Sequence, residues 1–135
     1  MENGKKPIRS YQDLNVYKNL YETMLIVLKK IIPRLPKEEK YDLVDQMRRC
    51  CKGSPALIAE GFAKRYQIRS WHKYLEDAIG EINEMIHHLN VCADVYSDFV
   101  DEKDIMAARE LYEISARQCY RLKEAWQDFH EKRQR

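Results

Sequence analysis

Apolar residues recur every three or four positions along most of the chain, which is the spacing that places them on one face of an α-helix. Near the N-terminus this stripe is made of Leu14, Tyr17, Leu20, Tyr21, Met24, Leu25, Leu28 and Ile31. The same spacing returns in two later segments, one ending at Tyr96 and the other at Phe129. The pattern predicts three long amphipathic helices, over residues 13–32, 71–96 and 101–132.

A further amphipathic segment contains the triplet Gly53-Ser54-Pro55, and a proline ordinarily interrupts a helix. The apolar residues nevertheless keep one helical phase across the triplet, at Val44, Met47, Cys51, Pro55, Ile58 and Phe62. At about 100° per residue, these six positions fall within roughly 40° of one direction. The pattern therefore predicts one helix over residues 36–65, kinked near Gly53 and Pro55, that still buries a single stripe.

Capping residues and prolines mark where the predicted helices begin and end. Ser10 and Asp13 are spaced as a capping box, in which each side chain accepts a hydrogen bond from the backbone of the other residue. Ser70 is placed as the N-cap of the third helix, and Pro33 and Pro36 separate the first helix from the second. Four helices with short connections predict an all-α fold, an up-down-up-down four-helix bundle with a proline-kinked second helix.

Composition and length fit a single soluble domain over residues 1–135, with flexible basic tails at 1–10 and 131–135. The chain is 44% hydrophobic and 34% charged, and four glycines and four prolines leave little material for hairpins. The first ten residues lack the apolar core of a secretory signal, and the longest apolar run is too short to span a membrane. The four cysteines show no Cys-x-x-Cys spacing, so we expect reduced, buried thiols and a cytoplasmic location.

Charge is distributed unevenly along the chain, although its formal net value is only +2. Residues 47–73 carry seven basic side chains against one glutamate, a net charge of +6, whereas residues 74–115 carry eleven acidic side chains against two basic ones, a net charge of −9. A basic surface attracts phosphate groups or an acidic partner. We therefore expect a face that binds nucleic acid through Arg48, Arg49, Lys52, Lys64, Arg65, Arg69 and Lys73.

Aromatic residues lie between these basic residues, and an exposed ring can stack on an unpaired base. Trp71 and Tyr74 fall on the buried stripe of the third helix, so Tyr66 is the one ring that we expect to be free. In the alternative interpretation, the basic face meets the acidic third helix of another copy. The protein would then be a homo-oligomeric protein–protein interaction scaffold with no direct role in nucleic-acid binding.

The residue pattern does not favour catalysis or metal binding. Glu84 and His87 have the Glu-x-x-His spacing of di-iron bundles, but both point away from the buried stripe and the sequence holds no second pair of this kind. Cys51 follows two arginines, which can lower a thiol pKa, yet it lies on the apolar stripe without a histidine placed to serve it. We expect no enzyme activity, no cofactor and no metal.

The second helix resembles a known family, that of the four-helix-bundle proteins encoded by intervening sequences in bacterial large-subunit ribosomal RNA genes. The accessory variability determinant of diversity-generating retroelements is related to that family. The family pattern, Asp-Gln-Ile-Arg-Arg-Ala and then Ser-Ile-Pro-Ala-Asn-Ile-Ala-Glu-Gly, is matched by Asp45, Gln46, Arg48, Arg49, Pro55, Ala56, Ile58, Ala59, Glu60 and Gly61. The resemblance covers residues 11–91, and it departs where Gly53 and Ser54 replace Ser-Ile and where Leu57 replaces Asn.

The resemblance implies a homopentameric barrel of bundles that binds RNA or DNA and performs no catalysis. For the retroelement relatives it also implies a reverse transcriptase as partner. For neither group does it imply binding to a membrane. The small side chain of Ala56 would let a neighbouring helix approach closely, and Glu60, on the far side from the buried stripe, is expected at a contact between subunits.

Overall fold

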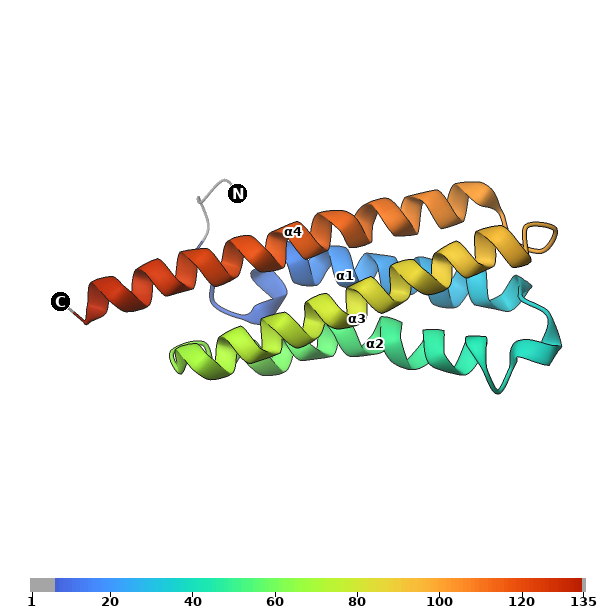
Figure 1. The fold of residues 1–135 in the computed structure, drawn as a ribbon. Coiled ribbons are helices and arrows are strands. Elements are labelled where there is room, and N and C mark those ends of the chain that lie inside the picture. Colours follow the sequence, from blue (N-terminus) through green and yellow to red (C-terminus); the bar gives the residue numbers. More distant parts are fainter. Residues whose placement is uncertain (1–6, 135) are drawn as a thin grey trace.

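Four long helices run alternately up and down, and each contacts its two neighbours in a closed ring (Figure 1). The computed structural model describes residues 7–134, and this range contains no β-strand. Its α-helices are α1 (Asn15–Ile26), α2 (Leu43–Phe62), α3 (Ile68–Val95) and α4 (Glu102–Arg133). The protein is an all-α, up-down-up-down four-helix bundle, as the apolar spacing predicts.

The predicted capping box is present, but it stabilises a shorter element than expected. Ser10 Oγ accepts a hydrogen bond from the Gln12 amide at 3.0 Å, and Asp13 Oδ2 accepts one from the Ser10 amide at 3.1 Å. The box caps the 3₁₀ turn Tyr11–Asp13, and α1 begins only after the extended residue Leu14. Hydrogen bonds from the backbone of Arg9 and Ser10 lower the pKa of the Asp13 carboxyl.

The connection between α1 and α2 is longer and less regular than the sequence predicts. After α1 the chain continues as the π-helix Val27–Ile31 and the 3₁₀ turn Ile32–Arg34. A further 3₁₀ turn, Lys37–Glu39, follows Pro36, so α2 starts at Leu43 and not at residue 36. A capping side chain or a proline indicates that a helix turn begins nearby, but it does not say whether that turn is 3₁₀, α or π.

The α-helix α2 continues through Gly53 and Pro55 without interruption, so the prediction of one helix across the triplet is confirmed. The kink at Gly53 and Pro55 stays a prediction. The predicted stripe is buried at Met47, Cys51, Pro55, Ile58 and Phe62, and half-buried at Val44.

The starts of α3 and α4 differ from each other in how they are capped. Ser70 is not an N-cap, because α3 already begins at Ile68 after the extended residue Gln67. At α4, by contrast, Asp101 is the N-cap and its carboxylate accepts a hydrogen bond from the Lys103 amide at 2.9 Å. Acidic side chains at this position also interact favourably with the positive end of the helix dipole.

The last turns of α4 extend beyond the turn that joins α2 to α3 (Figure 1). The predicted α4 stripe is buried from Ile105 to Cys119, but Trp126 is half-buried and Phe129 is 42% exposed. The helix continues to Arg133, so residues 131–133 of the expected C-terminal tail are helical. Most of the expected N-terminal tail, residues 1–6, and Arg135 lie outside the described residues.

All four cysteines are buried and unpaired, as predicted: Cys50, Cys51, Cys92 and Cys119. In the described part of the chain, no helix is both long enough and apolar enough to cross a membrane.

The bundle centre contains a buried hydroxyl without a partner, which leads to a stability prediction. Tyr112 is fully buried on α4, and its phenolic oxygen has no hydrogen-bond partner among the described residues. An unsatisfied buried polar group costs about 1–3 kcal/mol, so Tyr112→Phe should raise the free energy of unfolding by about 1 kcal/mol. Urea denaturation measures this change. Tyr120→Phe, at an exposed ring of the same helix, should change stability by less than about 0.5 kcal/mol, and a loss of stability in Tyr112→Phe would contradict the prediction.

Candidate nucleic-acid interface

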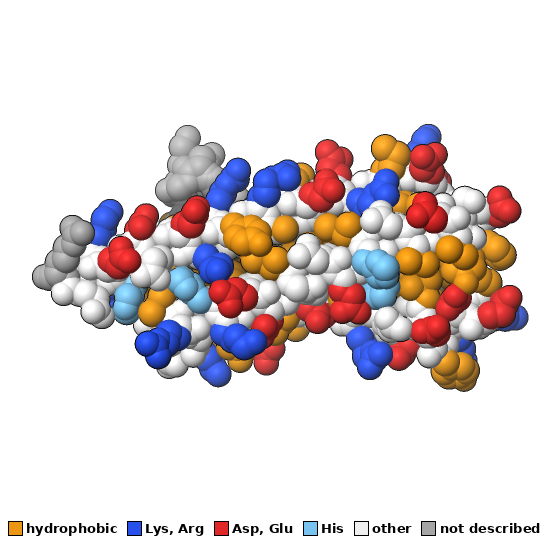
Figure 2. Space-filling model, viewed as in Figure 1, with side chains coloured by type: hydrophobic (Ala, Val, Ile, Leu, Met, Phe, Trp, Pro, Cys, Tyr) orange, Lys and Arg blue, Asp and Glu red, His pale blue; other side chains and the backbone are white. Residues whose placement is uncertain are grey.

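The structure divides the seven predicted basic residues into two groups. Arg48, Arg49 and Lys52 are exposed near the middle of α2, whereas the other four surround the turn between α2 and α3. Arg48 and Lys64 are sixteen residues apart, which corresponds to about 24 Å along a helix. The face shown in Figure 2 is not uniformly basic, because acidic side chains lie between the lysines and arginines.

In the α2 group, only part of the positive charge is uncompensated. Arg49 forms an exposed ion pair with Asp45, at 3.1 Å and one helical turn away. Arg48 and Lys52, one turn apart on the same helix, form no ion pair with any described residue. These two side chains remain available for an anionic partner.

At the α2–α3 turn, the basic side chains have more varied contacts. Lys73 pairs with Asp77 at 2.8 Å, and this hydrogen bond raises the pKa of Lys73. Lys64 lies over the ring of Tyr74, with its Nζ 5.4 Å from the ring centroid. Arg69 is exposed and forms no ion pair with any described residue. Three of the four cations of the turn therefore have no carboxylate partner in the described part of the chain, and the exception is Lys73.

The fourth of these cations, Arg65, is held against aromatic rings. Its guanidinium carbon lies 4.0 Å from the ring centroid of Phe62 and 4.8 Å from that of Tyr66. It also donates a hydrogen bond to the Phe62 carbonyl at 2.9 Å. Stacking on rings leaves the outer edge of a guanidinium free to donate to phosphate, so this arrangement orients Arg65 without neutralising it.

The protruding end of α4 completes the site. Tyr66 meets Trp126 edge to face, with ring centroids 5.5 Å apart, and Trp126 meets Phe129 in the same way at 5.0 Å. The guanidinium carbon of Arg133 lies 5.5 Å from the ring centroid of Tyr66 and 5.5 Å from that of Phe129. These residues enclose a cavity of about 250 Å³, which we call the arginine–aromatic pocket and which is lined by Arg65, Tyr66, Ile68, Trp126, Phe129, His130, Arg133 and Gln134.

The predicted roles of the aromatic residues are only partly correct. Trp71 is buried and Tyr74 half-buried, as predicted. Tyr66 is 58% exposed, but it is not isolated, because its ring contacts Trp126 and Phe129. The apolar spacing that ends at Phe129 also includes Trp126, and it predicts both residues on the buried stripe of α4. The sequence holds one indication that they are not fully buried. The fourth predicted helix is longer than the third, so its last turns have no predicted helix to pack against.

The predicted subunit contacts, Ala56 and Glu60, are both exposed on α2. Glu60 makes no ion pair with Lys64 among the described residues, although the two are spaced one turn apart. Their exposure leaves them available to a second copy, and their role at a subunit contact stays a prediction.

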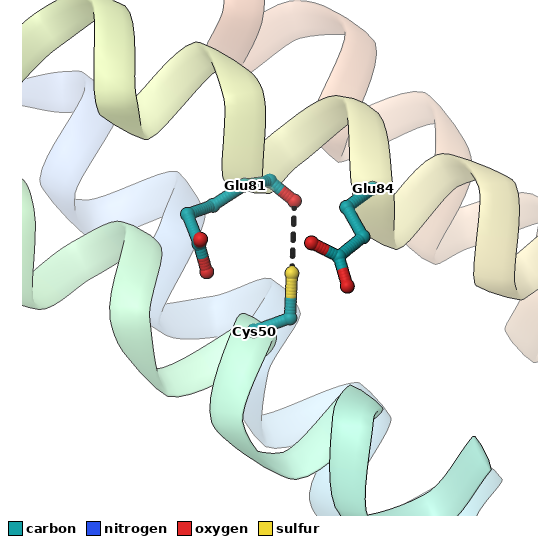
Figure 3. A group of neighbouring side chains, drawn as sticks. All are labelled: Cys50, Glu81 and Glu84. Atoms are coloured by element: carbon teal, nitrogen blue, oxygen red, sulfur yellow. Dashed lines mark hydrogen bonds between the residues drawn. The ribbon is translucent and has the colours of Figure 1, made fainter. Parts of the chain in front are cut away.

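A separate cluster between α2 and α3 brings together potential metal ligands. Ligand atoms of Cys50, Glu81 and Glu84 lie within 4.8 Å of one another, and the Cys50 thiol donates a hydrogen bond to the Glu81 carbonyl at 3.1 Å (Figure 3). Glu84 and His87 are exposed, as predicted, but His88 is buried and its Nε2 lies 3.1 Å from Glu84 Oε2. Since the thiol and one carboxylate already have partners within the bundle, we assign the cluster a structural role.

The geometry also bears on nucleophilic catalysis. Burial, together with the charges of Glu81 and Glu84, raises the pKa of the Cys50 thiol, and burial raises that of Cys51 to about 11. Both thiols are therefore protonated at neutral pH. Among the described residues, no thiol or hydroxyl forms a hydrogen bond with a histidine, which is the pairing that activates a nucleophile.

A ring of four antiparallel helices with a basic and aromatic cluster at one end defines this chain as a four-helix-bundle protein with a candidate anion-binding site. Residues 12–121 match the family model described as 23S rRNA-intervening sequence protein. The chain therefore belongs to this family, and the match extends beyond residues 11–91 into α4. Residues 122–134, which supply the α4 side of the arginine–aromatic pocket, lie outside the matched region. No curated protein matches the chain significantly.

Proposed function

We propose that this protein is a non-catalytic accessory protein that binds RNA through the end of the bundle where α2, α3 and α4 meet. The observation that carries the proposal is the gathering of Lys64, Arg65 and Arg133 around partly exposed aromatic rings, with Arg69 exposed in the first turn of α3. Positive side chains that displace counterions from phosphates supply most of the affinity for nucleic acid. The family description, which refers to an intervening sequence of 23S rRNA, favours RNA over DNA as the ligand.

We further propose that the protein works as a cytoplasmic homo-oligomer, with a pentamer as the expected assembly and a reverse transcriptase as the partner if it serves a retroelement. A groove beside α3 and α4, lined by Ile86, Met106 and Ala107 among others, leaves apolar surface uncovered. Met106 is 54% exposed there. Charged side chains, among them Lys103 and Glu110, line the same groove, so it offers a mixed surface that a second copy could cover, and such a contact would also serve the alternative function as an interaction scaffold. Light scattering after size exclusion measures the subunit number.

Reversing two charges at the turn should weaken RNA binding, with a loss that depends on salt. Lys64→Glu/Arg69→Glu removes two exposed cations, so it should lower the affinity for a labelled RNA hairpin about tenfold at low salt and reduce the salt slope by about two. Fluorescence anisotropy at several salt concentrations measures both quantities.

The matched control is Lys29→Glu/Lys30→Glu, which makes the same change of charge at exposed residues of the π-helix that follows α1. This variant should retain most of the affinity. If the wild-type protein binds no RNA at low salt, the proposed function is wrong. If both variants lose affinity equally, binding depends on overall charge and not on the α2–α3 turn. Arg48→Glu/Lys52→Glu tests in the same titration whether the α2 group also contacts RNA.

A further inference from the structure

We infer that the arginine–aromatic pocket binds one unpaired base of single-stranded RNA, with Arg65 and Arg133 holding the adjacent phosphate. This inference rests on the proposed function and specifies the form of RNA that the site recognises. It concerns a part of the chain that lies partly outside the region matched by the family model.

The first argument is the exposure of the rings. Tyr66 and Phe129 are 58% and 42% exposed, although Trp126, between them, is half-buried. The three rings meet edge to face or tilted, so they do not cover one another by stacking. Edge-to-face contact leaves ring faces uncovered by other rings. The guanidiniums of Arg65 and Arg133 lie over these faces, so a base would stack on the rings or on the flat guanidinium groups beside them.

The second argument is charge. The two guanidinium carbons, of Arg65 and Arg133, lie 4.8 and 5.5 Å from the same Tyr66 ring centroid. No carboxylate lines the pocket within the described part of the chain. A nucleotide has a flat aromatic base joined to a negative phosphate, so it complements a site that combines aromatic rings with two permanent cations.

The third argument is size and access. The cavity of about 250 Å³ is smaller than the roughly 300–1,000 Å³ of pockets that enclose drug-sized ligands, so it suits one base. In an RNA duplex each base is stacked between neighbours, and side chains cannot reach its faces through the deep, narrow major groove. The site should therefore prefer single-stranded RNA, whose bases turn outward freely.

Substitutions that remove a ring face but keep its bulk test the inference. Tyr66→Leu and Phe129→Leu should each weaken binding of a short labelled oligouridylate at least about fivefold, since stacking is worth about 1–3 kcal/mol per base. The affinity for a blunt RNA duplex of equal length should stay the same. Tyr66→Phe keeps the ring and should bind oligouridylate as the wild type does. Tyr41→Leu, at an 85% exposed ring in the α1–α2 connection, is the control and should have no effect.

A direct measurement does not depend on whether the leucine variants fold. Trp71 is buried and Trp126 is half-buried. The variant Trp126→Phe shows which part of the tryptophan fluorescence comes from Trp126. Adding oligouridylate to the wild-type protein should quench that part. Two results would overturn the inference while leaving the proposed function intact: equal affinity for single strand and duplex, or an unchanged Trp126 signal on saturation. A polyglutamate peptide that displaces oligouridylate and quenches Trp126 equally well would overturn it too. Absence of binding to any RNA would instead overturn the proposed function itself.

Discussion

Replacing Gly61 by alanine is expected to lower the free energy of unfolding by about 3 kcal/mol, at the upper end of the usual cost of overpacking a core. A Cβ atom at this position would lie 2.5 Å from the Cβ of Tyr74 and 2.9 Å from the ring of Trp71. Neither neighbour is the mobile end of a flexible side chain, since one atom is next to the α3 backbone and the other belongs to a fully buried indole. The two helices would have to move apart. Urea denaturation followed by circular dichroism measures the loss.

The control for this prediction is the same substitution on an open helix surface. Nothing lies within 4 Å of the position that a Cβ would take at Gly80, which is exposed on α3. There alanine should stabilise the chain by about 0.5–1 kcal/mol, because glycine is a poor helix former. Both substitutions gain the same helix propensity, so the difference between them isolates the close approach of α2 and α3. If Gly61→Ala were as stable as Gly80→Ala, the helices would have room that the structure does not show.

The helices themselves could be predicted from the sequence because their signal is local and repeated. A stripe of apolar residues such as that of α2 continues through Gly53 and Pro55, and its phase outweighs the two residues that disfavour a helix. The helix ends were predicted less well. Ser70 has the side chain of an N-cap, but the N-cap position of α3 is Gln67, three residues earlier, since packing against a neighbouring helix can add a turn that no capping residue marks.

The candidate site was harder to predict, because its parts come from segments far apart in the chain. The basic residues of the α2–α3 turn were identified from charge alone. Their partners Trp126 and Phe129 were not, because a stripe has the same spacing whether it faces a core or extends beyond it. Only the position of α3 beside α4 shows where the core ends. The contact of Cys50 with Glu81 is likewise a product of helix packing, and nothing in the local sequence predicts it.

Alkaline pH should destabilise the protein strongly, by about 4 kcal/mol between pH 8 and pH 10, because of its four buried thiols. Burial raises the pKa of Cys51 and Cys92 to about 11 and that of Cys119 to about 12, and it also raises that of Cys50. A thiol in the unfolded chain titrates near pH 9.0, so as the pH rises the unfolded chain loses its thiol protons first. The stability that protonated thiols contribute is therefore complete below about pH 9 and is lost above it, at about 1 kcal/mol for each thiol by pH 10.

Urea denaturation in a reducing buffer at pH 8 and pH 10 measures this loss, and Cys119→Ala provides the internal control. The variant is less stable at both values of pH because the substitution leaves a cavity. The free energy of unfolding that it loses between pH 8 and pH 10 should nevertheless be about one quarter smaller than the loss of the wild type. All groups other than Cys119 are the same in both proteins, so their contributions cancel from the comparison. An equal loss in both proteins would assign the effect to other groups, of which Tyr112, whose pKa burial also raises, is the first to test. A thiol reagent added at pH 8 should react with the cysteines only as fast as the chain unfolds, because burial hinders both ionisation and access.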